Sequence, residues 1–372
     1  MITATNKGTR MKELFNNLMD LANDDDTPFY YSLQTLNDEY YLIFSYHFTD
    51  KDSWLLKDAL ESRGIMFEVT KDVEYIRLAS RPMHKFFNHS FIENKGEVDF
   101  IDYGTPKYVM DKADGSLIST YLDGVGLLHL KSKASLHSDH AVAATEYLNE
   151  TANLGLKYLL NEMEDEGYTV NMEWVSPDPT FRIVLYYNEP KLIILNARHR
   201  YTGEYYDMDK IDSLDKVDIH PVSVLNDLET AIGIEGYVVV TDTGEWAKMK
   251  SVWYLERHRA KDFINQPMAF VELCLKDEAD DIFSLVEDQP EIHKEMLELQ
   301  HKVVTKANHY IANVTNYYNE NKDLSRKDYA IKAKAEMEGY EFALAMQYFV
   351  KQVEPDWEGF LLQVHKKVNW DL

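Results

Sequence analysis

The chain has 372 residues, of which 45% are hydrophobic, which is enough to bury a sizeable core and to form two domains. Its formal net charge of −25 argues against a protein that coats a polyanion, because phosphate contacts require a basic face. Any site for nucleotide or nucleic acid must therefore concentrate positive charge locally. The single cysteine, Cys274, excludes an intramolecular disulfide framework and a cysteine-based zinc site.

The chain carries no targeting or membrane signal that we can identify. Residues 1–10 contain no apolar run, so they do not form a secretory signal. No stretch reaches the roughly 18 consecutive apolar residues that a membrane-spanning helix needs. The sequence therefore predicts a soluble, cytoplasmic protein without a membrane partner, and we expect a monomer.

The first two thirds of the chain carry mostly strand signals. Leu14, Phe15, Leu18 and Leu21 recur at helical spacing and predict a helix over 12–23, before the breaker run at 24–26. Tight turns are indicated by Asp-Gly or Thr-Gly pairs at 114–115, 123–124, 202–203 and 243–244. Strands are expected at 40–46, 64–69, 181–187, 191–196 and 236–241, and a helix over 141–164.

From residue 255 onward the pattern is helical. Apolar residues at steps of three or four predict an amphipathic helix over 292–314. Ser325, three residues before Asp328, predicts the cap of a second helix over 329–353, which Pro355 follows. The predicted fold class is α+β, with an antiparallel-sheet domain over 1–254 and a small all-helical domain over 255–372.

The motif with the most chemical content is Lys112-Ala113-Asp114-Gly115-Ser116-Leu117, between two strand-like stretches. A lysine is a nucleophile only when neutral, so it needs neighbouring cations or a metal. An Asp-Gly turn lets the backbone approach a phosphate closely. Alone, this pattern also fits a surface hairpin. No GxxxxGK[ST] loop is present, which excludes a P-loop, and His137 with His140 is best interpreted as a plain surface pair.

The neighbouring motifs are more specific as a set than any one of them. They are ESRG at 61–64, SRPMHKFFN at 80–88, NMEWV at 171–175, IEGYV at 234–238 and WAKMK at 246–250. This ordered set resembles the covalent nucleotidyltransferase superfamily of RNA ligases, DNA ligases and mRNA capping enzymes. Segments 13–19, 43–46, 54–56 and 114–124 narrow the resemblance to the RNA ligase 1 family of T-even bacteriophages. The similarity is dense over 11–254 and sparser beyond, and residues 1–10 precede it.

The resemblance implies a role for each of these residues. Lys112 would attack the α-phosphate of ATP and become AMP-lysine, with Glu235 near the reacting lysine. The implied ATP-binding residues are Tyr46, Arg63, Lys85, Glu173, Lys248 and Lys250. Further phosphate or RNA contacts would come from Lys131, Lys133 and Tyr254, and metal ligands from Asp280 and Asp281. Mg2+ (or Mn2+) is implied because the phosphates of ATP must be neutralised.

Two of these pairs can also be argued from spacing. Lysines at i and i+2 on one strand point to the same face, which holds for 248 with 250 and for 131 with 133. Two ammonium groups on one face suit a phosphate site. The alternative interpretation is that these lysines lie on a solvated strand edge.

The implied function is ATP-dependent ligation of 5′-phosphate and 3′-hydroxyl RNA ends through lysyl-AMP and RNA-adenylate intermediates. By resemblance the substrate would be nicked tRNA or single-stranded RNA ends, and the role repair of cleaved anticodon loops in the cytoplasm of a phage-infected host. The alternatives are a non-catalytic RNA-binding relative, or a DNA ligase or capping guanylyltransferase. The helical tail has no OB-fold pattern, which disfavours the latter. The loop at 176–181 is longer than the family's, and the tail, which bears on RNA choice in the family, diverges most.

Overall fold

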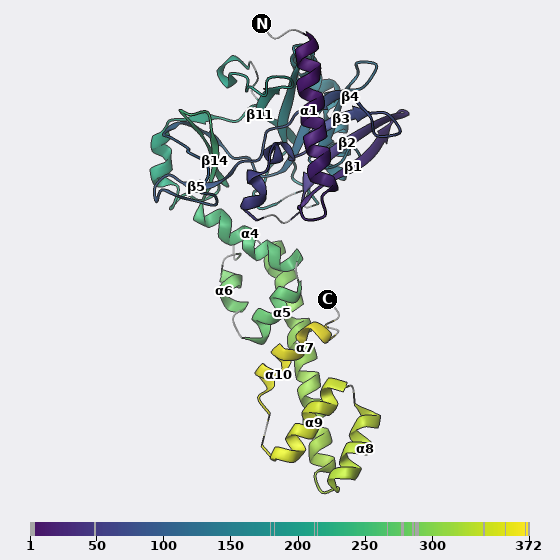
Figure 1. The fold of residues 1–372 in the computed structure, drawn as a ribbon. Helices are drawn as coiled ribbons and strands as arrows, with labels where there is room; N and C mark the ends of the chain where they lie inside the picture. Colours follow the sequence, from purple (N-terminus) through teal and green to yellow (C-terminus); the bar gives the residue numbers. More distant parts are fainter. Residues whose placement is uncertain are drawn as a thin grey trace. The chain divides into compact units, whose positions relative to one another are not determined.

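The computed structural model describes residues 4–47, 50–178, 180–181, 183–211, 213, 215–265, 267–276, 279–284, 286, 290–337, 339–353, 355–368 and 370. The chain forms two units, Met1–Tyr254 and Leu255–Leu372. Figure 1 shows that the first unit is built mainly of sheets and the second of helices.

The first sheet of the N-terminal unit is covered by a long helix. Strands β1 (Phe29–Leu36), β2 (Glu39–Tyr46), β3 (Met66–Val69) and β4 (Tyr75–Ser80) are antiparallel neighbours in that order. Helix α1 (Ala4–Asn23) buries its apolar stripe, including Phe15 and Leu18, against Phe44 and Phe67 of this sheet. The predicted helix is confirmed and begins earlier, at Ala4, and the predicted strands at 40–46 and 64–69 are present.

Two further sheets share a larger core. One has the order β11-β10-β8-β9, from β8 (Ser116–Leu122), β9 (Leu128–Ser132), β10 (Tyr168–Val175) and β11 (Lys191–His199). The other has the order β12-β7-β13-β14-β5-β6, from β5 (Phe87–Ser90), β6 (Lys95–Gly96), β7 (Pro106–Asp111), β12 (Ile219–His220), β13 (Gly236–Thr241) and β14 (Trp246–Lys250). Their strand pairs are antiparallel except for the parallel pair β14 with β5.

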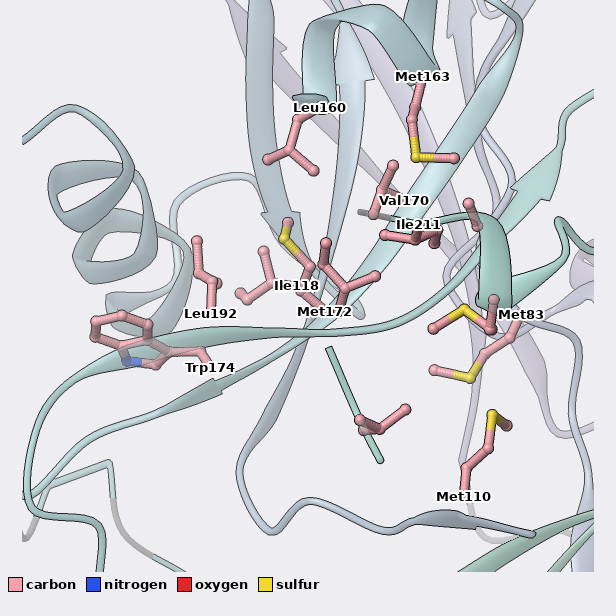
Figure 2. Close-up of a cluster of buried hydrophobic side chains, with 14 of the residues drawn as sticks. Met83, Met110, Ile118, Leu160, Met163, Val170, Met172, Trp174, Leu192 and Ile211 are labelled. Atoms are coloured by element: carbon pink, nitrogen blue, oxygen red, sulfur yellow. The ribbon is translucent and has the colours of Figure 1, made fainter. Parts of the chain in front are cut away.

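Side chains from both of these sheets pack into one shared core. Alternate residues of β10, among them Met172 and Trp174, point into it together with Met110 of β7. Leu160 and Met163 of helix α3 (Leu154–Asp165) pack on the same cluster, as Figure 2 shows. Helix α2 (Asp139–Leu148) adds Ala144 and Leu148. The resulting α+β unit with largely antiparallel sheets confirms the predicted fold class.

Three predicted elements are wrong. Residues 183–187 of the expected strand at 181–187 form bends and irregular chain, because their backbone amides bind a side chain elsewhere. The expected helix over 141–164 is two helices, α2 and α3, separated by the 3-10 turn Thr151–Asn153. The expected helix over 329–353 is likewise two, α8 (Arg326–Glu336) and α9 (Gly339–Lys351). Periodicity alone does not show such short breaks.

The C-terminal unit consists of helices in its described part. They are α4 (Val252–Asn265), which starts at the boundary, α5 (Pro267–Leu275), α6 (Ala279–Ser284), α7 (Pro290–Asn321), α8, α9 and α10 (Trp357–Val364). Helix α7 contributes to three small cores, through Met296, Val303 and Val314. The Ser325 hydroxyl accepts from the Asp328 amide at 3.2 Å, which confirms the predicted cap. Across the described residues of the whole chain, we find no helix with the length and apolarity needed to cross a membrane.

Candidate functional site

Lys112 follows directly after the last residue of β7. Its backbone amide donates to the carbonyl of Gly236, at the start of β13, at 3.0 Å. Gly236 has φ +140°, and a Cβ there would lie 2.1 Å from the carbonyl oxygen of Met249. Only glycine fits this position, because any side chain would push β13 and β14 apart. The glycine thereby brings Lys112 to the edge where both strands meet.

Glu235 holds two lysines with one oxygen. Its Oε1 accepts from Nζ of Lys112 at 2.8 Å and from Nζ of Lys250 at 2.9 Å. The Glu235 side chain is only 3% exposed, so its charge needs such partners. Because Lys112 follows β7 and Lys250 is the last residue of β14, this carboxylate holds together ammonium groups from two separate parts of the sheet.

Asp114 organises the loop that follows Lys112. The residue is buried, and its Oδ2 accepts from the amides of Val184 at 2.7 Å and Leu185 at 2.6 Å. Its Oδ1 accepts from the Tyr254 hydroxyl at 2.6 Å, and its own amide donates to the Tyr187 hydroxyl at 3.0 Å. These contacts hold the loop rigidly, and they explain why 183–187 does not form a strand.

Glu173 faces the same loop from β10. Its Oε1 accepts from the amide of Gly115 at 3.1 Å, and a Cβ on Gly115 would lie 2.2 Å from the carbonyl of Trp174. Burial raises the pKa of Glu173 to about 7, although the charge of Lys112 opposes that shift. A carboxyl group that titrates near neutral pH can change its charge when a ligand arrives.

Lys112, Glu173 and Lys250 line a cavity with about 860 Å³ of space, including open solvent. Its charged lining residues are Arg63, Asp111, Lys112, Glu173, Lys248 and Lys250. Burial lowers the pKa of Lys248 to about 7, helped by the charges of Lys85 and Arg63. Four cations against two carboxylates make this the local concentration of positive charge that an acidic chain needs in order to hold a phosphate.

Aromatic rings face several cations at this site. Phe86, Arg63 and Lys248 line the cavity, whereas Tyr46, Lys85 and Lys133 are not among its lining residues. Arg63 and Lys248 lie 5.3 and 5.4 Å from the ring centre of Phe86, and Lys133 lies 4.0 Å from that of Tyr46. Lys85 is 5.3 Å from the Tyr46 ring. Burial lowers the pKa of Lys133 to about 8, with Arg63 and Lys85 adding to the shift. Cations held by ring faces rather than by carboxylates keep their charge available to an anion.

Arg63 is joined to Glu61, whose carbonyl accepts from the Arg63 amide at 2.7 Å. Glu61, two residues earlier, accepts from Arg81 at 2.7 Å and from Arg198 at 2.8 Å. The Nη1 atom of Arg63 is buried and has no hydrogen-bond partner among the described residues. A buried guanidinium nitrogen without a partner is costly, so a bound acceptor such as a phosphate or ribose oxygen would satisfy it.

The structure separates some of the residues that the sequence grouped. Lys131 is wholly buried and donates to the Ser132 carbonyl at 3.1 Å, so it does not line the cavity, whereas Lys133 reaches Tyr46. Tyr254 is also buried and binds Asp114, which makes it a positioning residue. The side chains of Asp280 and Asp281 lie outside the described residues. In the part of the chain that the structure describes, no three His, Cys, Asp or Glu side chains form a metal cluster.

Two residues were not singled out from the sequence. The Tyr187 hydroxyl accepts from the Asp114 amide, and the ring of Phe86 faces the cations of Arg63 and Lys248. Phe86 lies within the SRPMHKFFN motif at 80–88, so its neighbours could have drawn attention to it. Nothing in the sequence signals Tyr187, because its partner is 73 residues away.

Known protein families match both units of the chain. Residues 61–256 match the family described as RNA ligase, and residues 261–367 match the family described as T4 RNA ligase 1, C-terminal domain. The first match alone covers more than half of the chain and spans Arg63, Lys112 and Lys250. The chain therefore belongs to the T4 RNA ligase 1 family.

Individual relatives are more distant. The chain is 29% identical over 255 residues to RNA ligase 1 of Bacteriophage TS2126, covering 64% of this chain and 62% of that protein. It is 28% identical over 263 residues to a putative RNA ligase of Thermovibrio ammonificans, covering 65% of each. The chain thus spans less than two thirds of the length of either relative. Among solved structures, form 2 of an archaeal ATP-dependent RNA ligase has 12% identity and a TM-score of 0.47, with 82% of each chain covered.

Proposed function

We propose that this protein is an ATP-dependent RNA ligase that forms a covalent lysyl-AMP on Lys112. The observation that carries the proposal is that Glu235 forms ion pairs with both Lys112 and Lys250. These two lysines line the cationic cavity. One lysine is thereby placed to attack a phosphorus atom, and the other to neutralise the charge that develops on its oxygens.

The first step is transfer of AMP to the protein. The Nζ of Lys112 attacks the α-phosphorus of ATP, a new N–P bond forms, and the bond to the pyrophosphate oxygen breaks. The lysine must first lose a proton. Oε1 of Glu235 lies 2.8 Å from Nζ of Lys112, and we propose it as the proton acceptor. The rigid loop around Asp114 keeps Nζ in position while this happens.

The two later steps join the RNA. An oxygen of the 5′-phosphate of RNA attacks the AMP phosphorus, the N–P bond breaks, and Lys112 is released. The 3′-hydroxyl of a second RNA end then attacks the 5′-phosphorus and AMP departs. Lys248, Lys250 and Arg63 are placed to stabilise the phosphates throughout, since phosphoryl transfer depends mainly on position and charge neutralisation.

A divalent cation fits this site only together with the nucleotide. Asp111, Glu173 and Glu235 supply carboxylate oxygens near Lys112, but no three described acidic or histidine side chains form a cluster that would hold a metal by themselves. Mg2+ is usually held by one or two carboxylates, waters and substrate phosphates. When bound, it would supply charge neutralisation of the triphosphate. We propose Glu173 and Glu235 as the nearby carboxylates.

The finer role is proposed from the family. We propose that the natural substrate is a nicked tRNA or a single-stranded RNA end, and that the helical unit 255–372 contributes to the choice of RNA. The match of residues 261–367 to the C-terminal domain of T4 RNA ligase 1 supports this assignment.

Labelling with α-32P nucleotide tests the proposal. The protein is incubated with a divalent cation and labelled ATP or GTP and run on a denaturing gel, beside Lys112→Ala and the control Lys107→Ala. Lys107 lies exposed on the same strand, so the control should label like the wild type. We expect an ATP adduct that Lys112→Ala alone abolishes. A GTP-only adduct would favour a capping enzyme, and no adduct at all would favour a non-catalytic RNA-binding protein. Comparing the sealing of RNA ends with the sealing of DNA ends then distinguishes an RNA ligase from a DNA ligase.

A further inference from the structure

A second cavity opens on Lys112, next to the first. It has about 840 Å³ of space open to solvent, and it shares Asp111, Lys112, Ala113 and Val217 with the cationic cavity. Its other walls come from Leu185, Tyr187, Lys191 and Ile193, the loop at 215–218, and Ile234 to Gly236. Lys112 therefore lines both cavities.

The lysines of this second cavity are already engaged. Nζ of Lys191 forms an ion pair with Asp215 at 2.7 Å. Nζ of Lys216 donates to the carbonyls of Met208 at 2.8 Å and Ile211 at 2.7 Å. Both ammonium groups thus already have acceptors from the protein, whereas Lys248 in the neighbouring cavity lies against the face of Phe86.

The groups that stay available are mainly acceptors. Asp218 is exposed and lines this cavity, and its carbonyl accepts from the amide of Asp111, the residue before Lys112, at 3.1 Å. Glu235 is 3% exposed and uses Oε1 for both lysines, which leaves Oε2 for a ligand. The Tyr187 hydroxyl accepts from the amide of Asp114, and burial raises the pKa of Tyr187, so it keeps a proton to donate.

We propose that this cavity binds the 3′-terminal ribose of the RNA strand whose hydroxyl is joined, with Asp218 accepting from a ribose hydroxyl. The inference rests on the proposed function. A ribose end is uncharged and rich in hydroxyl donors, which matches carboxylate acceptors, whereas a phosphate would be repelled by them.

The arrangement fits the sealing step. The 3′-oxygen forms a bond to the phosphorus of the adenylated 5′ end, the bond from that phosphorus to the AMP oxygen breaks, and the hydroxyl proton passes to solvent. AMP leaves into the cationic cavity. Lys112, free again after the second step, lies between the two spaces and can neutralise the phosphate there.

The test isolates this step with a chemically pre-adenylated RNA donor and acceptors that end in ribose or 2′-deoxyribose. We expect Asp218→Asn to raise KM for the ribose acceptor about tenfold, and to reduce the preference for ribose over deoxyribose. Asp218→Lys should raise KM further. Glu229→Gln, an exposed carboxylate outside the cavity, is the matched control.

The outcomes separate the two claims. Lysyl-AMP formation in the Asp218 variants, with weakened use of the acceptor alone, supports the inference. An unchanged KM in Asp218→Asn overturns it, and so does a lower KM in Asp218→Lys, which would indicate a phosphate site. A raised requirement for Mg2+ in the first step overturns it in favour of a cation site. If the wild type formed no lysyl-AMP, the proposed function itself would be wrong.

Discussion

Removal of one hydroxyl tests whether the loop around Asp114 is held as the structure indicates. In Tyr254→Phe the ring remains in its buried place, but the 2.6 Å hydrogen bond to Asp114 Oδ1 is lost. The buried carboxylate oxygen then has one donor fewer. Hydrogen bonds to a charged group contribute roughly 1.5–3 kcal/mol, so we expect the free energy of unfolding of the N-terminal unit to fall by about 2 kcal/mol.

This loss has a thermal and a catalytic consequence. For a unit of this size, 1 kcal/mol corresponds to roughly 2–4 °C, so the melting temperature should fall by about 4–8 °C. The rate of lysyl-AMP formation should fall about tenfold, because the loop that positions Lys112 loses an anchor. Calorimetry and a labelling time course measure the two effects.

The matched control is Tyr158→Phe. Tyr158 is 66% exposed on α3, so its hydroxyl is solvated and its loss should change neither quantity. A Tyr254→Phe protein that melts and labels like Tyr158→Phe would refute the reasoning, since it would show that Asp114 does not depend on this donor.

Three other perturbations follow from the charges. Glu235→Gln loses both ion pairs, and we expect lysyl-AMP formation to fall at least about 100-fold, measured with labelled ATP against the unfolding profile. The pKa of Lys248 is lowered to about 7 by burial, so its cation is lost as pH rises; KM for ATP should increase about 20-fold from pH 6.5 to 8.5, and Lys248→Arg should flatten that rise. Burial alone would raise the pKa of Glu61, but the charges of Arg198 and Arg81 lower it to about 2. The ionised carboxylate therefore stabilises the folded unit fully above pH 4.5, and this contribution is lost as pH falls towards 2. Glu61→Gln should therefore destabilise the unit by about 3–5 kcal/mol at pH 7 and by less at pH 3, as urea unfolding would show.

Each of these has an outcome that would contradict it. Full labelling by Glu235→Gln would remove the carboxylate from the first step. A KM for ATP that stays flat with pH in the wild type would mean that Lys248 does not meet the phosphates. Equal destabilisation by Glu61→Gln at both pH values would show that packing, not charge, is what the substitution removes.

Much of this protein could be predicted from the order of its residues. The step of three or four between Ile292 and Val314 indicated a long helix, and α7 covers it. The spacing of Lys248 and Lys250 on one strand required both to point the same way, and both line the cationic cavity. Periodicity and strand alternation are local geometry, so the sequence determines them directly.

The tertiary structure decided what each of these residues contacts. The segment 183–187 is irregular because its amides bind a carboxylate about 70 residues earlier in the chain. Lys131 and Lys133 share a pattern, yet one is buried and the other reaches an aromatic ring. The second cavity on Lys112 arises where five segments of the chain meet. Hydrogen bonds and burial join residues that are far apart in the sequence, so no local pattern encodes them. The sequence alone determined which groups are present. The packing of the sheets decided which of these groups meet.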